Sequence, residues 1–135
     1  MVRQLGLVIA GVGMALAVSG VPAAAHHAFA AEFDAKKPVL FKGTVTKMEW
    51  INPHVWIHID VKQDSGAVEQ WMVEGGAPNV LYKRGFSKQS LLPGTQVVVD
   101  GYRAKDGSKK MNAREITFSD GKKLFAGSSG TGAPT

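Results

Sequence analysis

The chain has 135 residues, with 16 lysines and arginines against 11 aspartates and glutamates, and it contains no cysteine. The lack of cysteine excludes disulfides, thiolate metal sites, a cysteine nucleophile and a lipoprotein anchor. The net charge of +5 is a modest basic excess, which suits an anionic partner and equally an ordinary solvated surface.

The first 25 residues have the pattern of a secretory signal peptide. Arg3 supplies positive charge, residues 5–18 are apolar, and Ala23 to Ala25 provide small residues for cleavage. The apolar stretch is shorter than the roughly 20 residues of a membrane-spanning helix, so we expect no transmembrane segment in the mature chain. Cleavage after Ala25 is favoured over cleavage after Ala23, and the expected location is periplasmic or secreted.

The mature chain is long enough for one domain but not for two. We expect an N-terminal segment at residues 26–38, a single domain at 39–126, and a disordered tail at 127–135 that is rich in Gly, Ser and Thr.

Apolar residues alternate with polar ones along much of the domain, which is typical of strands. We predict three successive strands at residues 39–50, 55–61 and 68–74, with a bulge or bend at Gly43 and a turn at Asn52-Pro53. One face of the second strand is aliphatic and is expected in the core: Val55, Ile57, Ile59 and Val61.

A short helix is predicted at residues 78–84, because Pro78 suits a helix start and Gly85 a helix end. Strands are expected again at 95–103, 112–119 and 122–125. The order βββ-α-ββ(β) predicts an all-β fold with one short helix, a small, partly open β-barrel of the oligonucleotide/oligosaccharide-binding type (OB-like). A plain antiparallel sheet with one helix packed on it is the alternative.

All four histidines lie in two clusters, His26 with His27 and His54 with His58. Two strand residues four apart are separated by about 13 Å, so His54 and His58 cannot hold one ion together. A chain cut after Ala25 offers the α-amino nitrogen and imidazole of His26 as a chelate. His27, or one of the strand histidines, would complete a nitrogen-rich set of the kind that Cu(II) favours.

The predicted metal ligands are therefore His26, His27, His54 and His58, with Cu(II) as the possible cofactor and Ni(II) next. Zinc is less favoured, because its closed sites use closely spaced Cys and His ligands, although Glu32 and Asp34 could add oxygen donors. The competing interpretation is that all four histidines are ordinary solvated residues.

Aromatic residues provide a second hypothesis. Trp50 and Trp56 flank the Asn52-Pro53 turn, where an exposed face could bind a glycan, a lipid headgroup or a protein partner without metal. The alternative for Trp71 and Trp50 is that they pack in the core, because aromatic residues dominate small cores. We do not expect nucleic acid as a partner, because the chain is expected to be exported.

No catalytic motif is recognisable, so we expect a binding module and not an enzyme. Glu74 precedes Gly75-Gly76 at a strand end, where a lone carboxylate is more typical of a turn than of acid–base chemistry.

Several segments resemble a family of small exported proteins of Gram-negative bacteria that carries a domain-of-unknown-function label. The most specific are AHHAFAAEFD at residues 25–34 and WINPHVW at residues 50–56. The resemblance implies export and a small β domain, and it supplies no activity or cofactor.

Overall fold

The computed structural model describes residues 29–127. The expected signal peptide, His26, His27 and the tail from residue 128 lie outside these residues. A helical turn at residues 29–32 precedes six strands and one short helix. These are β1 (Phe33–Glu49), β2 (Trp56–Lys62), β3 (Val68–Glu74), α2 (Pro78–Lys83), β4 (Gln96–Ala104), β5 (Lys110–Phe118) and β6 (Lys123–Phe125).

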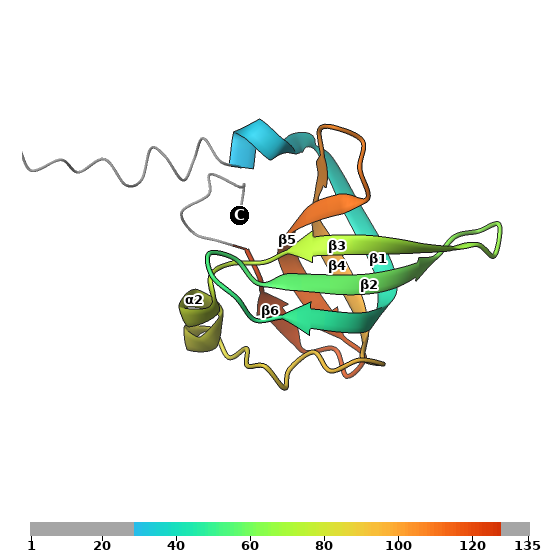
Figure 1. Cartoon of the computed structure of the whole chain (residues 1–135). Coiled ribbons are helices and arrows are strands. Elements are labelled where there is room, and N and C mark those ends of the chain that lie inside the picture. The colour runs from blue at the N-terminus through green and yellow to red at the C-terminus, as the bar shows by residue number, and fades with distance from the viewer. Residues whose placement is uncertain (1–28, 128–135) are drawn as a thin grey trace, which may run out of the picture.

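The strands form one sheet in the order β3-β2-β1-β4-β5-β6, and neighbours in this order run antiparallel. A short parallel pairing between the ends of β3 and β5 joins five of them into a ring (Figure 1). The expected all-β fold with one short helix is confirmed, and the ring is partly barrel-like because β3 pairs with β5 only from Met72 to Glu74.

The core contains the aliphatic residues that the alternating pattern of residues 55–61 predicts. Val55, Ile57, Ile59 and Val61 are all buried. Trp71 joins them from β3 and packs its ring against Phe41 with 4.4 Å between the ring centroids. The inward face of β2 therefore fixes its outward face as well, on which Trp56 and His58 lie.

Two details of β1 differ from the prediction. The strand begins at Phe33 and not at Val39, because its first part pairs with β4 across an irregularity between Phe33 and Pro38. The irregularity in the pairing with β2 lies between Val45 and Lys47 and not at Gly43. A Cβ at Gly43 would lie 3.0 Å from the Asp60 carbonyl oxygen, so glycine permits the close approach of β1 and β2.

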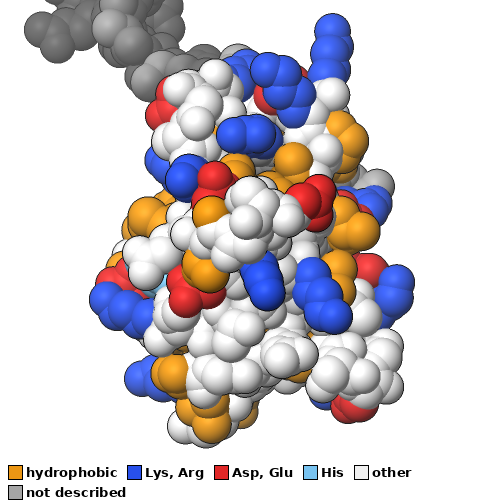
Figure 2. All heavy atoms as spheres, turned by 90° about the vertical axis from the view of Figure 1, so that its right-hand side faces the viewer, with side chains coloured by type: hydrophobic (Ala, Val, Ile, Leu, Met, Phe, Trp, Pro, Cys, Tyr) orange, Lys and Arg blue, Asp and Glu red, His pale blue; other side chains and the backbone are white. Residues whose placement is uncertain are grey.

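The β2–β3 hairpin projects at one end of the molecule, while α2 lies at the opposite end of the same strands (Figure 1). Viewed from the hairpin end, lysine and arginine side chains are spread over the surface with acidic side chains among them (Figure 2). No helix within residues 29–127 is long and apolar enough to cross a membrane.

Candidate functional site

The N-terminal segment is fixed to the strands by aromatic contacts. Phe29 and Phe33 are buried, and their rings stack with centroids 5.8 Å apart. Phe29 also meets the Tyr102 ring of β4 edge-on at 5.6 Å, while the backbone N–H of Lys105 donates to the Glu32 carbonyl oxygen at 2.8 Å. The chain therefore enters the fold at a defined place.

A cavity of about 160 Å³ lies at this place. Its walls come from the N-terminal segment, the loop before β2, and the ends of β3 and β5. Its polar lining consists of Glu32, His54, Glu74 and Asn112, and aromatic rings of Phe29 and Trp56 flank them. Oxygen and nitrogen acceptors thus converge within a partly apolar wall, the usual character of a small-ligand site.

The central contact of the cavity joins His54 to Glu74. His54 Nδ1 lies 3.0 Å from Glu74 Oε1, within ion-pair distance. The carboxylate comes from the end of β3 and is almost wholly buried, whereas the imidazole is about one quarter exposed. The Nε2 atom of His54 is left without a hydrogen-bond partner among residues 29–127.

Burial raises the pKa of the Glu74 carboxyl from 4.5 to about 7, because a charged carboxylate loses its hydration there. The negative charge of Glu32 raises this pKa further, and the Lys110 ammonium lowers it. Strongly shifted carboxyl pKa values are concentrated at functional sites, although ion pairs that serve stability shift them too.

Asn112 lies beside this pair and is 1% exposed. Its Oδ1 atom is buried and has no hydrogen-bond partner among the described residues. Because an unpaired buried acceptor is costly, the cavity is suited to a group that brings a hydrogen-bond donor, such as a water molecule or a ligand.

The Lys110 ammonium lies at the rim of the cavity, next to two of the residues that line it. Lys110 Nζ lies 3.5 Å from Glu32 Oε2 and 5.9 Å from the centroid of the Trp56 ring. The rim therefore already accommodates one positively charged group between a carboxylate and an aromatic face.

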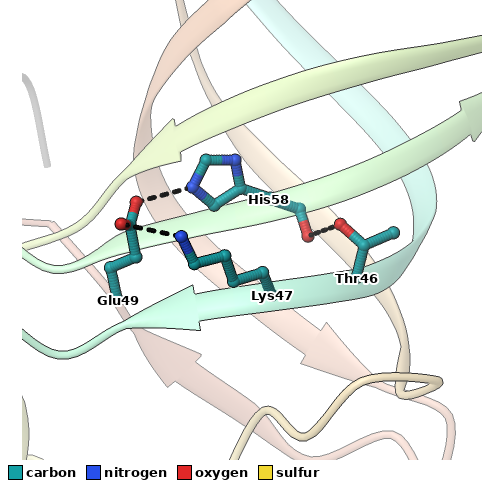
Figure 3. A network of polar contacts seen from close by, with 4 residues as sticks. All are labelled: Thr46, Lys47, Glu49 and His58. Carbon is teal, nitrogen blue, oxygen red and sulfur yellow. Dashed lines mark hydrogen bonds and ion pairs between the residues drawn. The ribbon is translucent and has the colours of Figure 1, made fainter.

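His58 occupies a different environment. Its Nε2 lies 2.7 Å from Glu49 Oε2, and Lys47 donates to the other oxygen of the same carboxylate at 3.0 Å (Figure 3). The hydrogen bonds from His58 and Lys47 lower the pKa of Glu49. His58 lines an open groove over β1, β2 and β3 and does not line the cavity with His54.

The predicted site residues are thus separated. His54 and Trp56 share the cavity. Trp50 is half-buried against the core and does not line this cavity. His26 and His27 lie outside the described residues, and within residues 29–127 no group of three or more His, Cys, Asp or Glu side chains could hold a metal ion.

The sequence interpretation missed Glu74 and Asn112 as partners of His54. The predicted strand 68–74 ends at Glu74 as observed, but no partner was predicted for this carboxylate, and the register pairs it with Trp56 beside the cavity. The register that follows from the turn at Asp64-Ser65-Gly66 could have revealed this neighbour, because a tight hairpin fixes which residues face each other. No local sequence signal identifies Asn112, which reaches the cavity from β5.

This chain belongs to a family of unknown function (DUF6152), whose match covers residues 14–113. The matched region contains all four histidines and the cavity residues from β2, β3 and β5. No curated protein and no solved structure matches the chain. The expected membership of a domain-of-unknown-function family is confirmed, and it assigns no activity.

Proposed function

We propose that this chain is an exported binding module that holds a divalent transition metal, Cu(II) in first place, where its mature amino terminus meets His54. The observation that carries the proposal is the His54–Glu74 pair. A histidine with one ring nitrogen beside a carboxylate and the other nitrogen free to bind has the arrangement usual for metal-ligating histidines.

Chain length supports a contribution from the amino-terminal histidines. Phe29 lines the cavity, and at up to 3.6 Å per residue the Cα atoms of His27 and His26 lie within about 7 Å and 11 Å of that of Phe29. This span is short enough for both imidazoles to approach the cavity that Phe29 and His54 line. After cleavage at Ala25, the α-amino group of His26 would add a further nitrogen donor.

The donor types available at the cavity favour Cu(II). Imidazole and amine nitrogens suit Cu(II), which binds most strongly among the divalent first-row ions. Glu74 would orient His54 and increase its basicity, and Asn112 Oδ1 is placed to accept a hydrogen bond from a metal-bound water. His58 is excluded from this ligand set because it lies in the separate groove.

A competitive Cu(II) titration tests this proposal. The protein is matured by export, its first residue is confirmed by intact mass, and Cu(II) is partitioned against a chelator of known affinity. We expect a Kd below about 1 nM, equivalent to roughly 12 kcal/mol, with losses of at least tenfold in His54→Ala and of orders of magnitude in the double variant His26→Ala/His27→Ala. His58→Ala is the matched control and retains the wild-type value.

Affinity equal to that of a peptide with the same first residues would overturn the proposal, since it would leave His54 without a role. Equal losses in His54→Ala and His58→Ala would do the same, because the two histidines lie in different depressions of the surface.

A metal-free recognition module is the second candidate, and the half-buried Trp56 in the cavity wall favours it. On this alternative, Trp56 and the Lys110 rim would hold a glycan, a lipid headgroup or a protein segment. Binding of such a ligand that survives metal chelation and is lost in Trp56→Ala would support it over the metal site.

A further inference from the structure

The pairing of β2 with β3 brings together two side chains that the sequence separates widely. His58 and Met72 are direct partners in the antiparallel register. Directly opposite residues of an antiparallel pair project on the same face with Cβ atoms about 5 Å apart. Both also line the open groove of about 450 Å³ that lies over these strands.

His58 has one ring nitrogen engaged and one available. Its Nε2 is bound to Glu49, and Figure 3 shows the other ring nitrogen directed away from that carboxylate. No described residue hydrogen-bonds to Nδ1. The carboxylate therefore fixes the orientation of the ring and leaves a nitrogen donor, as in the second-shell arrangement of metal-bound histidines.

Met72 supplies a sulfur donor at the same place. It is 38% exposed, whereas Met111 is fully buried and Met48 packs against the core. Among the methionines of residues 29–127, Met72 is thus the most exposed. Thioether sulfur is a soft ligand that selects Cu(I).

The charges around the groove are balanced. Each lysine that lines it has a carboxylate partner within 3.5 Å: Lys47 with Glu49, Lys109 with Glu69 and Lys110 with Glu32. A monovalent cation in the groove therefore meets paired charges and not an uncompensated group of lysines.

We propose that His58 Nδ1 and Met72 Sδ form a binding site for Cu(I). Two donors, one of them a thioether, are a poor site for hard divalent ions, which take several oxygen ligands. The site is independent of the proposed Cu(II) site, because it uses no residue of the cavity or of the amino terminus. Together the two would let one small chain hold copper in both of its oxidation states.

The test uses Ag(I) as a redox-stable probe for Cu(I). The mature protein is labelled with ¹³C at its methionine methyl groups and titrated with silver nitrate in chloride-free buffer, and the methyl resonances are followed by NMR. The Met72 methyl is expected to shift and to saturate at one equivalent. The resonances of Met48 and Met111 serve as internal controls and stay unchanged.

Variants assign the ligands. Met72→Leu conserves side-chain volume, and we expect it to weaken Ag(I) binding by more than about tenfold, as does His58→Gln. Met48→Leu is the matched methionine control and retains wild-type affinity, because Met48 packs against the core. Competition for Cu(I) against bicinchoninate should give the same ranking.

An unshifted Met72 methyl at saturating Ag(I) would overturn the site, even if Met72→Leu failed to fold. Wild-type Ag(I) affinity in Met72→Leu would overturn it equally. Neither result would affect the Cu(II) proposal. That proposal is tested by the fall in Cu(II) affinity in His54→Ala, which involves a different ion and a different depression of the surface.

Discussion

Two histidines, His54 in the loop before β2 and His58 on β2, differ in what surrounds them. The side chains of His54 and His58 are each 27% exposed, and each has a ring nitrogen within 3.0 Å of one glutamate oxygen. The glutamate of His54 is 9% exposed at its side chain and that of His58 is 31% exposed. Burial therefore raises the pKa of Glu74, while hydrogen bonds lower the pKa of Glu49.

The comparison shows that a histidine–carboxylate pair takes its properties from the carboxylate's surroundings. The cavity pair joins a nearly dehydrated carboxylate to a histidine beside an unpaired amide oxygen. The groove pair belongs to a solvated network with Lys47 and Thr46 (Figure 3).

The largest difference is expected between the tryptophans beside the two sites. Trp71 contributes to the groove but is buried in the core, so Trp71→Ala should lower the free energy of unfolding by about 3–5 kcal/mol. Trp56 is half-buried in the cavity wall, so Trp56→Ala should lower the free energy of unfolding much less. Urea denaturation of both variants measures this, and equal losses would show that the cavity wall is part of the core.

Glu74 makes the stability depend on pH. Its pKa of about 7 in the folded protein exceeds 4.5, so the folded state holds a proton that the unfolded state releases between these values. Stability is therefore full below about pH 4.5 and falls as the pH rises to about 7, by on the order of 3 kcal/mol.

Glu74→Gln should remove this fall, because the amide does not ionise. Chemical denaturation of wild type and variant across pH 4 to 8 provides the measurement. The same slope in both proteins would mean that Glu74 is charged without penalty in the folded state, and the contrast with Glu49 would disappear.

Cu(II) should stabilise the mature protein through the cavity. At free Cu(II) one hundred times the Kd, binding to the folded state alone adds about 2.7 kcal/mol. We expect the corresponding rise in Tm in wild type and in His58→Ala, a clearly smaller rise in His54→Ala because its affinity is weaker, and reversal of the rise by EDTA. A rise of equal size in all three proteins would place the metal away from both histidines.

The smallest effect is expected at the groove carboxylate. Glu49→Gln removes a solvated interaction with His58 and Lys47, and such surface pairs contribute little to stability. The Tm should stay close to that of the wild type, and Cu(II) affinity should not change. A large fall in Tm would show that the network of Figure 3 supports the strands more than its exposure suggests.

Local pattern was sufficient to predict the elements of this fold, while the contacts between them required the structure. The alternation from Val55 to Val61 predicted both the core face and the outward face of β2, because a strand has period two. The start of β1 at Phe33 was missed, since polar residues before Pro38 conceal a strand that is held by pairing with β4.

The site was predicted only in part for the same reason. His54 and Trp56 were identified from their residue types, yet their partners Glu74 and Asn112 arrive from β3 and β5. Met72 was overlooked because its relation to His58 exists only through the strand register. Partners across a register follow from turn geometry and pairing, which residue composition does not encode.

Pulsed electron paramagnetic resonance of the Cu(II)-loaded mature protein is the decisive experiment for the His54 site, because it counts the imidazoles bound to the ion. We expect His54→Ala to lose one coordinated imidazole and His58→Ala to keep the wild-type number. An unchanged spectrum in His54→Ala would rule out the site, since the metal would then be held by the amino terminus alone.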